Sequence, residues 1–180
     1  MRSLALILSL VAAAPAWATG LDLTVAGKGT VSIDLLEDVA PEHVRRITTL
    51  ARNGAYDGVV FHRVIDGFMA QTGDVQYGRV DGDLSQAGFG GSDLPDLAQE
   101  FSDRPFERGT VGMARSGNSV DSANSQFFIM FQPAPHLNGQ YTVVGEVTSG
   151  MEVVDAITRG EGRGGSVSNP DVIESVTVTE

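Results

Sequence analysis

The sequence has no cysteine among its 180 residues. The chain therefore cannot form a disulfide, use a thiol nucleophile or carry a lipid on cysteine. Basic residues are also scarce, with 12 Lys and Arg against 23 Asp and Glu, which gives a formal net charge of −11. Binding to a phosphate backbone needs clustered Lys and Arg, so we expect no nucleic-acid partner.

No apolar run reaches the about 20 residues that a membrane-spanning helix needs. The longest, Leu4–Ala14, follows Arg2 and precedes the small-residue pattern Ala16-Trp17-Ala18. This pattern predicts a secretory signal peptide over residues 1–18 and a mature domain over residues 19–180. We therefore expect a protein without a membrane anchor, exported to a bacterial periplasm, with secretion into the medium as the second choice. The acidic composition favours a monomer.

Residue patterns for metal binding and for hydrolysis are missing as well. The three histidines, His43, His62 and His136, do not have the spacing of zinc ligands, and the nucleophile motif G-x-S-x-G is absent. We expect no metal and no cofactor, and a hydrolase is the weakest functional hypothesis. His62 lies in an apolar run, which favours a buried core histidine over a proton shuttle.

Short alternating runs dominate the first half of the mature chain. Leu21, Leu23 and Val25 alternate, and after a turn at residues 27–29 so do Val31, Ile33 and Leu35, which predicts a hairpin. A helix is predicted from Pro41 to the stop signal Asn53-Gly54. Residues 75–96 are rich in Gly, Asp and Ser and are interpreted as a long ordered loop.

The second half predicts further strands and one more helix. We expect strands at Gly109–Ala114, Ser125–Phe131 and Gln140–Val147, with Asn138-Gly139 as a hairpin turn before the last of these. A short helix around Met151–Ile157, a mobile glycine-rich loop at Glu161–Ser168 and a closing strand at Val172–Val178 follow. Many short strands and two helices predict a mainly β domain, with a closed or nearly closed antiparallel sheet and helical lids.

Residues 61–74, F-H-R-V-I-D-G-F-M-A-Q-T-G-D, carry the strongest functional signal. Two apolar runs, Val59–Val64 and Phe68–Gln71, flank the turn signal Asp66-Gly67. The turn brings the second run back beside Arg63, so a guanidinium lies next to an apolar patch. Such a pair suits a ligand with one polar group beside one apolar ring.

The same stretch, with S-Q-F-F-I at Ser125–Ile129, closely resembles the cyclophilin-type peptidyl-prolyl isomerases. G-T-V-G-M-A-R-S at Gly109–Ser116 and L-N-G-Q-Y-T-V-V-G at Leu137–Gly145 resemble further segments of that family in the same order. The chain looks most like the exported bacterial members. The resemblance implies a closed eight-stranded antiparallel barrel capped by two α-helices. It also implies peptidyl-prolyl cis-trans isomerisation of proline-containing, unfolded or partly folded polypeptides, without a cofactor or covalent intermediate.

The resemblance also implies roles for single residues. Arg63 matches the catalytic arginine of the family. Substrate binding is implied for ten others: Phe68, Met69, Gln71, Ala114, Arg115, Gln126, Phe128, His136, Leu137 and Tyr141. Taken without the resemblance, the apolar members could be plain core residues and Arg63 a surface salt-bridge partner.

Three of these positions depart from the common family pattern. His136 stands where many members have the tryptophan linked to tight cyclosporin binding, Arg115 where asparagine is common, and Tyr141 where eukaryotic members often have histidine. We therefore expect weak inhibition by cyclosporin. The departures also leave open a second function class, a binding module that holds a proline-containing segment without useful turnover.

Overall fold

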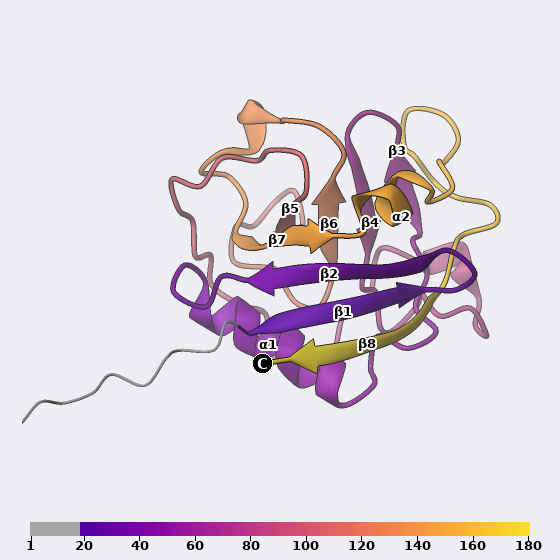
Figure 1. Ribbon diagram of the computed structural model, residues 1–180, viewed down its shortest axis with the longest axis horizontal. Helices are drawn as coiled ribbons and strands as arrows, with labels where there is room; N and C mark the ends of the chain where they lie inside the picture. Colours follow the sequence, from indigo (N-terminus) through magenta and orange to yellow (C-terminus); the bar gives the residue numbers. More distant parts are fainter. Residues whose placement is uncertain (1–18) are drawn as a thin grey trace, which may run out of the picture.

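The computed structural model describes residues 19–180, so the predicted signal peptide lies outside the described residues. Within this range the chain forms one eight-stranded sheet, two α-helices and two short 3-10 turns, at Leu84–Gln86 and Pro135–Leu137 (Figure 1). The larger elements in chain order are β1 (Gly20–Val25), β2 (Gly29–Leu35), α1 (Pro41–Arg52), β3 (Arg63–Ile65), β4 (Met69–Thr72), β5 (Thr110–Met113), β6 (Phe127–Met130), β7 (Val143–Ser149), α2 (Met151–Asp155) and β8 (Ile173–Thr179).

The sheet is antiparallel throughout and curls around the core. Its strand order is β3-β4-β6-β5-β7-β2-β1-β8. The predicted hairpin of β1 and β2 is confirmed, with Leu23 opposite Val31, and its alternating apolar side chains are buried. Helix α1 packs beside β8 and α2 packs against β2 (Figure 1). No helix of the part of the chain described here is long and apolar enough to cross a membrane.

The hairpin of β3 and β4 confirms the most informative sequence prediction. Its register places Arg63 opposite Gln71 and Ile65 opposite Met69. The turn between them contains Gly67, whose φ of +66° is a conformation that favours glycine. Alternation along the strands thus sets a guanidinium and an amide side by side on one face of the sheet.

The closed barrel that the resemblance implies is not observed: the sheet is an open half-barrel, and its edge strands β3 and β8 are not paired with each other. The backbone of β3 has another partner, the loop 160–168. Val64 N–H donates to the Gly165 carbonyl (2.7 Å), and Gly160 N–H donates to the Val64 carbonyl (2.8 Å). The segment before β3 does meet the start of β8: Phe61 N–H donates to the Asp171 carbonyl (2.9 Å), Ile173 N–H donates to the Val59 carbonyl (2.8 Å), and an isolated bridge joins Val60 to Val172.

The Asn138-Gly139 turn also differs from its prediction, because it does not close a hairpin. Strands β6 and β7 both pair with β5, which lies between them in the sheet. The turn instead follows the 3-10 segment Pro135–Leu137, and β7 begins at Val143 rather than Gln140. This detour leaves Leu137 free to pack in a second cluster of buried side chains, separate from the main core.

That second cluster lies against the face of the sheet that carries Arg63. It contains Leu36, Met69, Phe106, Phe128, Met130, Ala134, Leu137 and Val143, with Phe68, Ala114 and Tyr141 partly buried against it. The main core, built from residues of β1, β2, α1 and β8 among others, fills the inside of the curled sheet. Several residues that the resemblance assigns to substrate binding therefore belong to a packed structure and are held rigidly by it.

Helix α1 begins without a capping side chain of its own, because Ala40 occupies the N-cap position. Glu100, from a distant loop, accepts hydrogen bonds from the backbone N–H groups of Glu42 (3.2 Å) and His43 (3.1 Å). It also pairs with Nδ1 of the buried His43 ring at 2.6 Å. Burial alone would raise the pKa of Glu100, but the hydrogen bonds from His43 and Glu42 outweigh it and hold the pKa below its ordinary value.

We expect Glu100→Gln to lower the free energy of unfolding at pH 7 by about 1 kcal/mol, since a charged cap at a helix N-terminus is lost. A carboxylate with a lowered folded-state pKa stabilises the protein above its unfolded pKa of about 4.3 and loses this effect as the pH falls through the folded value. In urea unfolding, the free energies of unfolding of Glu100→Gln and the wild type should therefore differ most at pH 7, less at pH 5 and least at pH 3.5. Glu174→Gln, at an exposed position on β8, is the control; an equal loss at every pH would contradict the prediction.

Candidate active site

Arg63 begins strand β3 and is held from two sides. Its Nη1 donates to Oε1 of Gln71 (3.0 Å), and its Nε donates to the backbone carbonyl of Gly164 (3.0 Å). A guanidinium has five N–H bonds, and only these two have partners within residues 19–180. The remaining three can serve a ligand.

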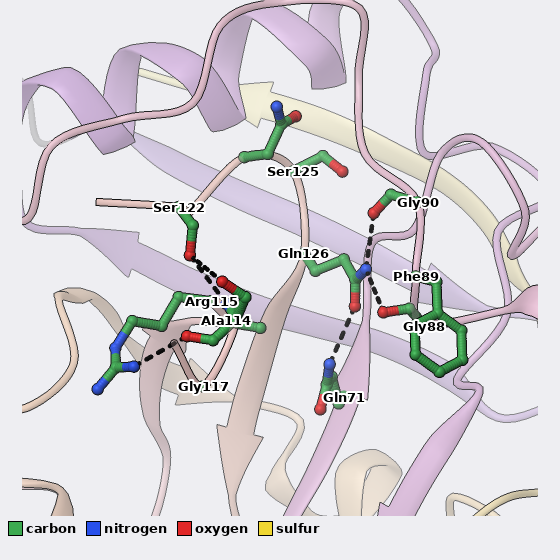
Figure 2. Close-up of a pocket in the computed structure, with 12 residues that line it drawn as sticks. Gln71, Gly88, Phe89, Gly90, Ala114, Arg115, Gly117, Ser122, Ser125 and Gln126 are labelled. Atoms are coloured by element: carbon green, nitrogen blue, oxygen red, sulfur yellow. Dashed lines mark hydrogen bonds between the residues drawn. The ribbon is translucent and has the colours of Figure 1, made fainter. Parts of the chain in front are cut away.

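A chain of amide hydrogen bonds continues behind Gln71 (Figure 2). Nε2 of Gln71 donates to Oε1 of Gln126 (2.9 Å). Nε2 of Gln126 donates in turn to the carbonyls of Gly88 (3.0 Å) and Gly90 (2.8 Å). Because the two carbonyls can only accept, they fix which end of each amide points toward Arg63, so an acceptor oxygen faces the guanidinium.

The far end of this chain rests on Asp74, a residue that the sequence analysis did not assign to the site. Its buried carboxylate accepts hydrogen bonds from the N–H groups of Gly88 (2.7 Å) and Gly90 (3.0 Å), and from those of Gln76 and Tyr77. Asp74 thus fixes the loop whose carbonyls orient Gln126. The available signal was its place at the end of the motif F-H-R-V-I-D-G-F-M-A-Q-T-G-D.

An apolar hollow of about 150 Å³ lies beside the guanidinium. Its floor is the second core cluster: Met69 is 2% exposed, Phe128 5% and Leu137 7%. The hollow brings together nine of the eleven residues that the sequence predicts for the site, namely Arg63, Phe68, Met69, Gln71, Ala114, Arg115, Phe128, Leu137 and Tyr141. The remaining two lie next to it, Gln126 behind Gln71 and His136 stacked on Phe68 with ring centroids 5.7 Å apart.

Arg115 and Tyr141 form one wall of the apolar hollow. The guanidinium carbon of Arg115 lies 4.5 Å from the centre of the Tyr141 ring, within the range of a cation–π contact. Its Nε and Nη2 donate to the carbonyl of Gln140, and its Nη1 donates to that of Ser116. This wall is therefore held by backbone acceptors, as Arg63 is.

A second, larger hollow of about 360 Å³ adjoins the first across Ala114 (Figure 2). Gln71, Ala114, Arg115 and Gln126 border it together with the loops 88–90 and 116–125. Phe89 stands at its rim with 87% of its surface exposed. The sequence analysis interpreted residues 75–96 only as a long ordered loop, because Gly88 and Gly90 contribute to the site through their backbone.

The residues of the site give little support for acid–base or metal catalysis. His62 is buried, as predicted, and burial lowers its pKa, so the ring is neutral at neutral pH. Among residues 19–180 there is no group of three or more His, Cys, Asp or Glu side chains that could hold a metal ion. The groups that converge on the apolar hollow are hydrogen-bond donors, amides and apolar side chains, which suits binding and reorientation of an uncharged ligand.

Comparison with known proteins agrees with this geometry. The family model for "Cyclophilin type peptidyl-prolyl cis-trans isomerase/CLD" matches residues 20–178. A probable peptidyl-prolyl cis-trans isomerase of Brucella suis is 60% identical over 153 residues, which cover 83% of this chain and 78% of the relative. A peptidyl-prolyl cis-trans isomerase of Helicobacter pylori is 39% identical over 153 residues, which cover 83% of this chain and 80% of the relative.

A solved structure shares the fold. The cyclophilin-type isomerase of Cryptosporidium parvum superposes with a TM-score of 0.79, covering 91% of this chain and 99% of that chain, at 22% sequence identity. The family match spans nearly all of the described residues. The chain belongs to the cyclophilin-type peptidyl-prolyl cis-trans isomerases.

Proposed function

We propose that the chain accelerates rotation about X-Pro peptide bonds by hydrogen bonding from Arg63 to the twisted amide. The observation that carries this proposal is Arg63, oriented by Gln71, at the edge of a hollow of a size suited to one ring. Amide resonance gives uncatalysed rotation a barrier of about 18–20 kcal/mol. Exchange then takes about 10–100 s at 25 °C.

Arg63 can distinguish the transition state from the ground state. In a planar amide the nitrogen lone pair is delocalised and accepts hydrogen bonds poorly. In the half-rotated amide the lone pair is localised, so a guanidinium N–H can donate to it. An interaction made only in the transition state raises the rate, whereas one made equally in both states does not.

The size of this effect sets a limit on what Arg63 does alone. A hydrogen bond to a charged group contributes about 1.5–3 kcal/mol, which corresponds to roughly a ten- to a hundredfold rate increase. The rest falls to the apolar hollow, where Phe68, Met69, Phe128 and Leu137 would hold the proline ring while the acyl side rotates. No bond is broken in this reaction, so it requires no proton transfer, covalent intermediate or redox group.

The substrate class follows from the openness of the site. The apolar hollow and the second hollow both lie at the surface, so an extended segment of an unfolded or partly folded polypeptide could cross them with its proline in the apolar hollow. We infer that such polypeptides are the substrates and that the enzyme is a monomer. Arg115, one of the sequence departures, packs on Tyr141 as part of the wall of the apolar hollow.

Export is the second part of the proposal. We infer that residues 1–18 direct the chain to a bacterial periplasm and are removed there. The support is the arrangement of Arg2, the apolar run Leu4–Ala14 and the small residues before Thr19. The enzyme would then act on proteins that fold after translocation.

Replacing Arg63 tests the catalytic part. Arg63→Ala should lower kcat for a proline peptide by about ten- to a hundredfold, while peptide affinity changes little, because the apolar side chains of the hollow are intact. Exchange between cis and trans forms, measured by NMR at saturating peptide, gives the rate. Arg45→Ala, at an exposed position of α1, is the matched control. Wild-type turnover in Arg63→Ala would refute the mechanism, and peptide binding by the wild type without accelerated exchange would favour a binding module.

His136 gives a prediction about inhibition. We expect weak binding of cyclosporin, because the exposed His136 imidazole offers less apolar area than the indole found in many family members. His136→Trp should tighten binding by at least about tenfold, the change expected for about 1.4 kcal/mol of added contact. Inhibition titrations of both proteins check this; tight binding by the wild type would contradict it.

The export proposal is tested by sequencing the mature N-terminus. Full-length protein made in a Gram-negative host should appear in the periplasmic fraction and begin at Thr19. Ala18→Arg should block processing, because signal peptidase sites require a small residue there, whereas Thr19→Ser should leave it unchanged. Recovery of unprocessed wild-type protein in the cytosol would overturn the assignment.

A further inference from the structure

We propose that the glycine-rich loop 160–168 positions Arg63 for catalysis, with the carbonyl of Gly164 as its contact point. The inference rests on the proposed role of Arg63 and adds to it a second support, independent of Gln71. A guanidinium on four rotatable bonds has about 2 kcal/mol of rotamer entropy to lose. A partner on each side removes that cost before the substrate arrives.

The contact itself is specific. Nε of Arg63 donates to the Gly164 carbonyl at 3.0 Å, while Nη1 donates to Gln71 at 3.0 Å. Two acceptors on different edges of a planar group fix its rotation as well as its position. The Gln71 contact alone would leave the guanidinium able to turn about that single hydrogen bond. The loop thus completes the orientation of the N–H groups that remain for the amide nitrogen.

The loop is attached firmly enough to act in this way. Val64 N–H donates to the Gly165 carbonyl, Gly160 N–H to the Val64 carbonyl, and Val167 N–H to the His62 carbonyl (3.2 Å). Within the loop, Glu161 N–H donates to the Ser166 carbonyl (2.8 Å). The mobile loop expected from the composition is therefore bound along the edge of β3, on both sides of Arg63 in the sequence.

Gly165 explains why this approach needs glycine. Its φ is +72°, and a Cβ at this position would lie 2.5 Å from Cγ1 of Ile65 and 2.9 Å from the Val64 carbonyl oxygen. Any side chain here would push the loop away from β3 and carry Gly164 with it. The neighbouring Gly164 has no such constraint, since a Cβ there would meet nothing within 4 Å and its φ is not positive.

Gly165 and Gly82, a glycine outside the site, form a matched pair for experiment. Gly165→Ala should lower the exchange rate at saturating proline peptide by about three- to tenfold. This factor is the share of the rate effect of a charge-assisted hydrogen bond that depends on its orientation. The Kd of the peptide should stay within about twofold, because the apolar hollow is untouched. Gly82→Ala should keep the wild-type rate, because Gly82 lies outside the site, its φ is not positive, and a Cβ there would meet only the Arg79 carbonyl oxygen, at an ordinary 3.5 Å.

A double-mutant cycle separates positioning from general damage. In the Arg63→Ala background, Gly165→Ala should change the remaining rate by less than about twofold, because the group to be positioned is gone. If Gly165→Ala kept full activity, or lowered the rate equally with and without Arg63, the proposal would be overturned. A failure of the proposed function would be visible separately, as an unchanged rate in Arg63→Ala alone.

A measurement on the wild type covers the case in which Gly165→Ala does not fold. The ¹⁵Nε–¹H signal of Arg63 should exchange with solvent at least about tenfold more slowly than that of the exposed Arg45, because its N–H is bonded to a carbonyl. Equal exchange rates for the two signals would show that the contact with Gly164 is absent in solution, and would also overturn the proposal.

Discussion

The hydrogen bond between Arg63 and Gln71 is the interaction on which the site depends. It joins a charged donor that the reaction needs to the amide of Gln71, whose orientation is fixed by its hydrogen bond to Gln126. Without a fixed acceptor, a long cationic side chain at a half-exposed position would sample many rotamers and point mostly to water. In this protein a hydrogen-bonded chain of neutral groups holds the guanidinium in place, from Gln71 to Gln126 to the carbonyls of loop 88–90.

The fold supplies that arrangement with few parts. A three-residue strand and a tight turn set Arg63 opposite Gln71, and β6 then brings Phe128 opposite Gln71 on its other side. The polar orienting groups and the apolar ring site therefore come from three adjacent strands in register. Asp74 fixes the N–H groups of Gly88 and Gly90, and its own carboxylate is fully buried.

Sequence reasoning reached this part of the molecule because side chains carried the signal. Alternation around Asp66-Gly67 placed Arg63 beside Gln71, and the family resemblance added the apolar residues, nine of the eleven predicted residues meeting at one hollow. It missed Gly164, Gly88 and Gly90. These residues act through backbone carbonyls, which every residue type has, so the sequence gives no signal for them. It also predicted a closed barrel and a hairpin at Asn138-Gly139. Both errors concern long-range strand pairing: the edge of β3 is taken by a glycine-rich loop, and β5 enters between β6 and β7.

The partners of the two arginines at the hollow share one property that bears on catalysis. Among the described residues, Arg104, Arg108 and Arg159 pair with carboxylates, in a chain that has 23 Asp and Glu. Arg63 and Arg115 instead donate hydrogen bonds only to amide and carbonyl oxygens within the same range. A carboxylate would orient a guanidinium equally well, but it would also neutralise the charge that strengthens a hydrogen bond to a weak acceptor such as an amide nitrogen. Neutral acceptors orient the group and leave its charge available. For a reaction in which the catalyst can offer only one hydrogen bond and an apolar hollow, preserving that charge is the more effective use of the site.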